Sequence, residues 1–200
     1  MSKGQETKLK ILQQAAELFN QQGYAGASMS DIMKVTGLQK GGIYNHFQSK
    51  EDLAIQAFDY AIAQYVQRYQ GVIQGKRHAI ARLQAIIDIF ASFGENPPIT
   101  GGCPILNTAI ESDDAHPALR ERTQVAMNGW RHLICRIIQK GIARGEIHPE
   151  VNPDETTTVM IATLEGGLMM SKLYGDMIHL QRAIKHLHEY VIARLSPPQP

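Results

Sequence analysis

The sequence predicts an all-α fold in which a small N-terminal helical head is followed by a larger helical body. Apolar residues recur at three- and four-residue spacing along most of the chain, which is the pattern of amphipathic helices. Glycines and prolines divide that pattern into segments of helical length, and we see no strand pattern between them. We expect the head to comprise residues 1–50 and the body residues 51–200, with the fourth helix crossing the boundary.

The charge of the chain is uneven although its total is small. The net charge is +1, but residues 1–50 contain six lysines against three acidic residues, so this quarter is net +3 and the remainder −2. A basic segment on a neutral-to-acidic body is expected where one end of a protein contacts nucleic-acid phosphates. An uneven scatter of surface lysines is the alternative that composition leaves open.

The remaining composition places the protein in a reducing, aqueous compartment. The hydrophobic fraction of 44% is enough for a core, and two cysteines do not make a disulfide framework. The N-terminus lacks the apolar region of a signal peptide, and no apolar run reaches the length of a membrane span. We therefore expect a cytoplasmic protein with no membrane partner.

Two helices are predicted before residue 38. An apolar stripe indicates a first helix over residues 5–22, closed by Gly23 as a left-handed cap, and its members are Leu9, Leu12, Ala16 and Phe19, widened by Ile11, Ala15 and Leu18. Ser28 and Asp31 have the three-residue spacing of a capping box and begin a short second helix. Gly37 ends that helix after Ile32 and Val35 have faced inward.

Residues 38–50 read as the recognition helix of a helix-turn-helix. Ile43 and Phe47 are four residues apart and form its inward pair, while polar side chains occupy the other positions. Ser49 and Asp52 repeat the capping-box spacing and start a long helix to about residue 74. Three short helices with tight turns followed by a long one are typical of a DNA-binding head on a connecting rod.

The order of residues in this head closely resembles the TetR family of bacterial transcriptional regulators. The matching residues are Ala15-Ala16-Glu17-Leu18-Phe19, Gly23-Tyr24, Ser28, Asp31-Ile32, Gly37-Leu38, Lys40-Gly41, Ile43-Tyr44, His46-Phe47 and Ser49-Lys50-Glu51. The match covers about the first quarter of the chain, and the remaining helical length is similar to the family's regulatory domain. The resemblance implies a homodimeric, sequence-specific regulator, with repression of a palindromic operator and release by a small-molecule effector as the expected mode of action.

The side chains of the predicted recognition helix suit a DNA groove. Lys40 is long enough for a guanine edge or a phosphate, and the amides of Gln39 and Asn45 match adenine. Lys50 and Ser28 lie at helix starts where a phosphate is favoured. The resemblance implies that Tyr44 and His46 contact the DNA backbone, although packing or surface roles are the alternatives for these two residues.

Two adjacent glycines in this short helix conflict with its local stability. Gly41 and Gly42 should each cost roughly 1 kcal/mol relative to alanine in a helix interior. A helix in a groove gains close backbone approach from them. Many members of the family that this sequence resembles have a hydroxyl residue at the position of Gly42. This protein therefore has one polar contact fewer there, and we do not expect it to share their operator sequences.

The body is predicted to contain five further helices. They cover residues 78–93, 103–111, 116–144, 152–174 and 176–195, with a breaker-rich loop over 94–102 and a stop at Pro197-Pro198. Two of the starts have strong local signals, Pro104 directly after Cys103 and Pro153 after Asn152.

The last two helices carry the predicted dimer interface. Leu180, Ile184, Leu187 and Val191 are spaced by four, three and four residues, as in a coiled-coil seam. Gly166 and Gly167 in the preceding helix permit close approach of a second helix. The alternative is that this seam packs inside a single subunit.

An effector pocket is predicted among the helices of the body. Its expected lining is apolar and adaptable, suited to a hydrophobic or aromatic molecule, and comprises Phe90, Phe93, Leu106, Met127, Trp130, Met160 and Leu164. Plain core packing is the competing interpretation. Cys103 at a helix start is a candidate for a low-pKa thiol that senses oxidants or electrophiles, against a small buried residue, and Cys135 is expected to be structural.

Three functions from other classes are the alternatives to the predicted regulator, and the basic head argues against the last of them, a purely protein-binding helical module. A small helical enzyme is disfavoured, because the eight histidines form no recognisable metal-ligand set and no phosphate loop or nucleophile elbow is present. We expect no catalytic residues, metal or cofactor. A DNA binder without sequence preference is another, and the small net charge argues against it.

Overall fold

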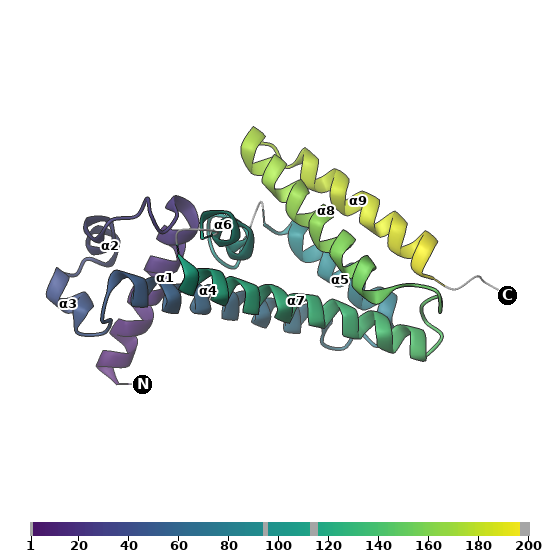
Figure 1. Ribbon diagram of the computed structural model, residues 1–200, viewed down its shortest axis with the longest axis horizontal. Helices are drawn as coiled ribbons and strands as arrows, with labels where there is room; N and C mark the ends of the chain where they lie inside the picture. The colour runs from purple at the N-terminus through teal and green to yellow at the C-terminus, as the bar shows by residue number, and fades with distance from the viewer. Residues whose placement is uncertain (1, 94–95, 113–115, 197–200) are drawn as a thin grey trace. The chain divides into compact units, whose positions relative to one another are not determined.

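The computed structural model describes residues 2–93, 96–112 and 116–196, and these are all-α as predicted (Figure 1). The α-helices are α1 (Lys3–Gln22), α2 (Met29–Thr36), α3 (Lys40–Tyr44), α4 (Lys50–Ile73), α5 (Ala79–Ala91), α6 (Pro104–Glu111), α7 (Pro117–Ala143), α8 (Pro153–Tyr174) and α9 (Ile178–Tyr190). The last predicted helix is divided in the structure, because a π-helical turn, η1 (Val191–Leu195), follows α9. Pro197-Pro198 lies outside the described residues.

The chain forms two compact units. The first comprises residues 1–66 and 97–126, and the second comprises residues 67–96 and 127–200. Helices α4 and α7 therefore each contribute residues to both units, and α6 belongs with the first three helices. The division into a DNA-binding head at residues 1–50 and a regulatory body at residues 51–200 stays a prediction.

Local capping fixes the ends of the first two helices. Ser2 and Gln5 form a capping box that starts α1 two residues earlier than predicted. Gly23, at the end of α1, has the positive φ of 78° but an extended ψ of 163°, so the predicted left-handed cap is wrong in its ψ. The predicted cap of α2 is confirmed, since Ser28 and Asp31 form a reciprocal capping box and Gly37 is left-handed. The stripe on α1 is also shifted, because Leu9 is exposed and Ile11 is fully buried.

In the second unit, α9 packs along α8 and also against α5 (Figure 1). Leu83 and Ile87 from α5, Leu164 and Leu168 from α8, and Leu180 from α9 are all buried there. Helices α8 and α9 approach closely at Gly167, where an added Cβ would stand 2.7 Å from the Cβ of Ala183. This glycine is therefore needed for packing within one subunit.

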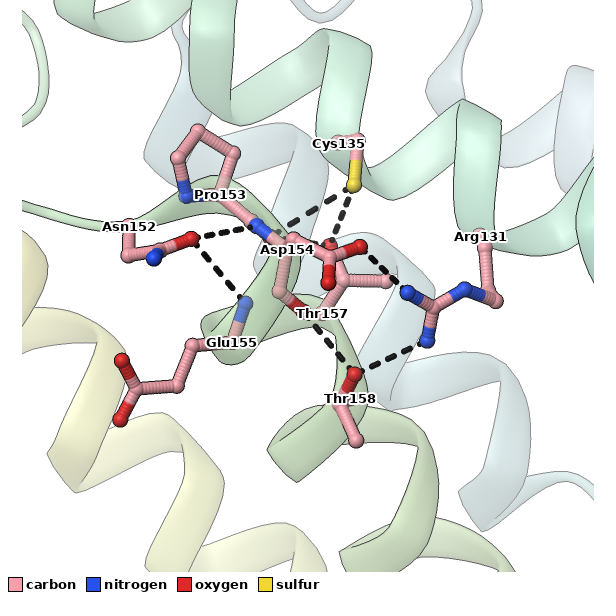
Figure 2. A network of polar contacts seen from close by, with 8 residues as sticks. All are labelled: Arg131, Cys135, Asn152, Pro153, Asp154, Glu155, Thr157 and Thr158. Atoms are coloured by element: carbon pink, nitrogen blue, oxygen red, sulfur yellow. Dashed lines mark hydrogen bonds and ion pairs between the residues drawn. The ribbon is translucent and has the colours of Figure 1, made fainter.

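The start of α8 is tied to α7 by a network of polar contacts (Figure 2). Asn152 caps α8 by accepting hydrogen bonds from the backbone amides of Asp154 and Glu155 at 3.0 and 3.2 Å. Arg131 on α7 forms an ion pair with Asp154 and donates a hydrogen bond to Thr158 at 2.9 Å.

Cys135 belongs to the same network. Its Sγ lies 3.1 Å from the hydroxyl of Thr157 and 3.6 Å from the carbonyl oxygen of Pro153, so its thiol joins α7 to α8 (Figure 2). A structural role for this cysteine is in line with the sequence interpretation. No helix within the described ranges combines the length and apolar character required to cross a bilayer.

Candidate nucleic-acid interface

The recognition helix predicted over residues 38–50 is shorter in the structure, where α3 spans only Lys40–Tyr44. One buried side chain within α3 and one just after it hold this segment against the rest of the first unit. Ile43 and Phe47 are almost completely buried, as predicted for the inward pair. Gln39 begins the helix without a side-chain cap, and the next residue, Lys40, is exposed. The buried pair therefore fixes which face of α3 points outward.

The outward face carries side chains that are predicted to contact DNA. Lys40 and Tyr44 are four residues apart and share this face, with the Lys40 Nζ 5.7 Å from the centroid of the Tyr44 ring. Asn45 is exposed beside them, whereas His46 is half-buried with its ring 6.4 Å from that of Phe47. An ammonium, a phenol and an amide on one exposed face can contact phosphates and base edges together.

The two glycines of α3 have different surroundings. A Cβ added at Gly41 would meet no atom within 4 Å, whereas one at Gly42 would lie 3.7 Å from the Cβ of Leu38, an ordinary packing distance. Nothing in the described protein around Gly41 requires glycine. The open space on that side is consistent with the predicted close approach of DNA.

Ser28 is committed to capping α2. Its hydroxyl donates to an Asp31 carboxylate oxygen at 2.5 Å and accepts from the Asp31 amide at 3.1 Å. The Ser28 amide donates to the same carboxylate at 2.9 Å. These hydrogen bonds, first that from the Ser28 side chain and then that from its backbone, lower the pKa of Asp31 below its ordinary value of 3.8. Ser28 is exposed, so a DNA phosphate can still reach it, and its predicted phosphate contact stays a prediction.

The lowered pKa of Asp31 predicts an acid-dependent loss of the α2 cap. Because the folded-state pKa lies below 3.8, the cap contributes its full stability above that pH and loses it as pH falls through the folded-state pKa. We expect Asp31→Asn to unfold at lower urea concentration than the wild type at pH 7, with the difference shrinking below pH 3.8. Urea titrations at several pH values measure this, and a difference that grows on acidification would contradict it.

Lys50 is placed differently from the predicted phosphate ligand. Its Nζ donates to the carbonyl oxygen of Tyr24 at 2.6 Å and lies 4.3 Å from the centroid of the Tyr24 ring. The ammonium group is thus engaged with the turn between α1 and α2. Lys50 links the start of α4 to that turn in this structure, and a phosphate contact would require it to leave this position.

Part of the predicted effector pocket comes together as an aromatic cluster in the second unit. The Phe90 and Trp130 rings are stacked with centroids 5.7 Å apart, and the Phe93 ring lies 4.6 Å from that of Phe90. Tyr69, which the sequence did not indicate, lies 6.1 Å from Trp130. Its position on the long α4 gave no signal beyond ordinary helical periodicity.

The other predicted pocket residues do not all join this cluster. Met160 and Leu164 are fully buried in the second unit, and Met127 is half-buried there. Leu106 and Cys103 belong to α6 and its N-cap in the first unit. Within the described ranges, no group of three or more His, Cys, Asp or Glu side chains is placed to hold a metal ion.

A pocket that the sequence did not indicate lies between α1, α4, α6 and the start of α7. Its lining comprises Ala16, Phe19, Asn20, Tyr24, Ala54, Ala57, Phe58, Ala61, Pro104, Thr108, Glu111 and Leu119. None of the predicted effector contacts is among these residues. The segments that form it are brought together only by the fold, so periodicity along the chain could not reveal it.

The predicted dimer seam is largely buried within the subunit. Leu180, Leu187 and Val191 are 0–1% exposed, because α9 packs against α8 and α5 of its own chain. Gly167 is also buried, because the Ala183 side chain of the same subunit occupies the space beside it. These four residues cannot form an intersubunit contact without opening the subunit, and the prediction is corrected for them. Of the other two, Ile184 is half-buried, while a Cβ at Gly166 would meet nothing within 4 Å.

Comparison with known protein families agrees with this architecture. Residues 11–57 match the family described as bacterial regulatory proteins, tetR family, and residues 79–187 match the tetracyclin repressor-like C-terminal domain. Together these regions cover both the helix-turn-helix and most of the helices that follow it.

Individual relatives extend the match over the whole chain. A TetR transcriptional regulator from Chloroflexus aurantiacus is 48% identical, with a TM-score of 0.95 over 99% of this chain and 100% of that one. A TetR-family regulator from Cytophaga hutchinsonii is 30% identical, with a TM-score of 0.90 over 100% and 99% of the two chains. The transcriptional regulator LmrA of Bacillus subtilis is 29% identical over 91% of this chain and 96% of its own length. The protein belongs to the TetR family of transcriptional regulators, with an N-terminal helix-turn-helix DNA-binding domain and a helical C-terminal domain.

Proposed function

We propose that the protein is a dimeric, sequence-specific repressor that leaves a palindromic operator when a small molecule binds its body. The observation that carries this proposal is the exposed face of α3 and its C-cap, which presents Lys40, Tyr44 and Asn45. Ile43 in α3 and Phe47 just after it are buried on the opposite side. Phosphate contacts would set its register and base-edge contacts its specificity. A dimer on the operator would occlude polymerase, and the protein would act in the cytoplasm.

Affinity for an operator compared with random DNA tests this proposal. We expect a palindromic site from the upstream region of the protein's own gene to bind about a thousandfold or more tightly than random duplex at the same salt concentration. Equal binding to both would instead support the rival reading of a DNA binder without sequence preference. Turnover of a bound small molecule without operator binding would support the enzyme reading.

An exposed apolar stripe on α8 replaces the predicted dimer seam. Val159, Ala162, Gly166, Met169 and Leu173 follow one another at steps of three, four, three and four residues, and all except the half-exposed Gly166 are exposed. Leu173 is 74% exposed, and the space around Gly166 is open. A heptad-spaced stripe of this kind fits the same stripe on a second copy related by twofold symmetry.

The aromatic cluster supports an effector site in the body. Trp130 is 8% exposed, and its indole N–H has no hydrogen-bond partner among the described residues. A buried donor without a partner costs roughly 1–3 kcal/mol, so an acceptor that reaches it gains this energy. We propose an apolar or aromatic effector that carries a hydrogen-bond acceptor and binds against this aromatic cluster, with its acceptor directed at the Trp130 indole N–H.

The fluorescence of Trp130 provides the test, because it is the only tryptophan in the chain. Compounds that release the operator are expected to shift or quench this emission. Their affinity, measured by calorimetry, should fall about tenfold in Trp130→Phe, which keeps a ring and removes the donor. A hydrocarbon analogue that lacks the acceptor should lose less. Effectors that release DNA without changing the emission of Trp130 would contradict the site.

An electrophilic effector is the second candidate. Cys103 is the N-cap of α6, where backbone amides favour a thiolate, but the residue is only 4% exposed. The Cys103→Ser variant separates the two candidates under the same fluorescence and release assays. An electrophile sensor would lose its response to alkylating agents in this variant, whereas the Trp130 site would respond as in the wild type.

A further inference from the structure

One face of α6 contacts the C-terminal end of α1 and the turn that follows it through two polar side chains. Asn107 and Glu111 are four residues apart on this helix and therefore lie on the same side. The Asn107 Nδ2 donates to the Asn20 carbonyl oxygen at 3.0 Å and to the Asn20 Oδ1 at 2.8 Å. Asn20 in turn donates to the carbonyl oxygens of Thr100 and Gly102 at 2.9 and 2.8 Å, just before α6 begins.

Glu111 binds the first residues of the turn itself. Its two carboxylate oxygens accept hydrogen bonds from the backbone amides of Tyr24 at 2.8 Å and Ala25 at 2.7 Å. The Tyr24 carbonyl oxygen accepts a hydrogen bond from the Lys50 ammonium group at 2.6 Å. A carboxylate thus binds the backbone N–H of Tyr24, and an ammonium group binds its carbonyl oxygen. The Tyr24 ring also meets the ring of His116 edge to face with centroids 4.3 Å apart. Tyr24 is therefore the point at which the α1–α2 turn, α4, α6 and the start of α7 meet.

Apolar residues also line the space between the two helices. The pocket described above lies between Phe19 on α1 and Pro104 and Thr108 on α6. At the points where they do meet, the fit is tight around backbone. A Cβ at Gly23 would lie 2.8 Å from the Glu111 carboxylate, and one at Gly101 would lie 2.8 Å from the Asn20 carbonyl oxygen. The hydrogen bonds of Asn107 join α6 to the end of α1, and those of Glu111 join α6 to the turn.

We propose that Glu111 is a positioning residue for operator binding. It holds the α1–α2 turn and, through that turn, helices α2 and α3. The turn ends at Ser28, which caps α2, and α2 leads through Gly37 directly into α3. With Glu111 removed, the turn must be ordered when the operator binds, and that cost lowers affinity. The inference rests on the proposed operator-binding function, but it assigns a role to a residue that would not touch DNA.

The charge of Glu111 makes this proposal sharply testable. A carboxylate near DNA repels phosphate, so removing it would strengthen binding if its only influence were electrostatic. A purely structural role would lower the melting temperature and leave the affinity of the folded protein unchanged. Positioning alone predicts weaker operator binding after the loss of a negative charge.

The experiment compares Glu111→Ala and Glu111→Gln with the wild type. We expect operator affinity to fall about tenfold in Glu111→Ala and less in Glu111→Gln, which keeps one acceptor oxygen and the side-chain shape. Affinity for random duplex should fall less, so the specificity ratio should drop while the slope of affinity against salt stays the same. Hydrogen exchange of the Tyr24 and Ala25 amides should be faster than in the wild type, and the increase should be larger in Glu111→Ala than in Glu111→Gln.

Glu121→Gln is the matched control, because Glu121 is an exposed carboxylate of the same unit. Its removal should leave the specificity ratio and the Tyr24 exchange unchanged. Operator binding by Glu111→Gln and Glu111→Ala that equals or exceeds that of the wild type would overturn the proposal. If the wild type itself does not prefer its operator to random duplex, the proposed function is wrong. If the exchange of the Tyr24 and Ala25 amides is unchanged in both Glu111 variants, the Glu111 contact does not hold the turn, and the positioning proposal is wrong.

Discussion

Replacing Lys40 with alanine is expected to lower operator affinity by about ten- to a hundredfold. Lys40 stands exposed at the first position of α3, on the face that it shares with Tyr44. A specific contact to a base edge is worth about 1–3 kcal/mol, and its loss should relax discrimination at the base pair it reads. Equilibrium binding to the operator and to a panel of single-base variants measures both effects.

Lys34→Ala is the control for charge alone. Lys34 is also exposed, but it lies in the last turn of α2 and outside the recognition helix. Its loss should weaken binding to all duplexes by a similar factor, as expected for a general electrostatic contribution. If Lys40→Ala and Lys34→Ala weaken every sequence equally, α3 is not reading bases through Lys40.

Replacing Leu173 with glutamate should disrupt the dimer and, with it, operator binding. Leu173 is 74% exposed on the α8 stripe, and in a twofold interface each substitution occurs twice. Burial of a leucine is worth about 1.5–3 kcal/mol, and the variant also places two carboxylates in an apolar contact. We expect the dimer dissociation constant to rise about a thousandfold or more, as measured by analytical ultracentrifugation.

Ile110→Glu tests whether any exposed apolar residue would give the same result. Ile110 on α6 is 69% exposed, which makes it a close match to Leu173 in accessibility and chemistry. This variant should remain a dimer and bind the operator. A Leu173→Glu protein that sediments as a dimer would exclude the α8 stripe as the interface.

Local signals in the sequence predicted most of the fold. Ser28 with Asp31, Pro104 after Cys103 and Asn152 before Pro153 act over a few residues, and each marks a helix start that the structure confirms. The buried Ile43 and Phe47 pair was predictable for the same reason, because a helix face is visible in the spacing of residues along the chain. These signals also sufficed to orient the recognition helix.

The choice of packing partner could not be read from spacing. Leu180 and Leu187 on α9 have the periodicity of a dimer seam, but the same periodicity fits α9 against α5 and α8 of its own chain. Val35 likewise has the position of an inward residue on α2 and is exposed. Apolar spacing shows that a face is covered and does not show by which element.

The contacts around Tyr24 were beyond sequence reasoning for a different reason. Glu111 is separated from Tyr24 by 87 residues, and a lone glutamate near a helix end has no distinctive pattern. Lys50 had a plausible role as a phosphate ligand until the structure placed it at the Tyr24 carbonyl. Only the folded backbone brings these three residues together.

Chemical footprinting on the operator tests the central claim most directly. A dimer that presents two α3 helices should protect two symmetry-related major-groove segments, with centres about 34–36 Å apart or a multiple of that distance. Methylation interference should mark guanines or adenines within those segments, and Lys40→Ala should remove part of that pattern. A single protected segment, or protection that does not depend on sequence, would contradict the account of a paired reader.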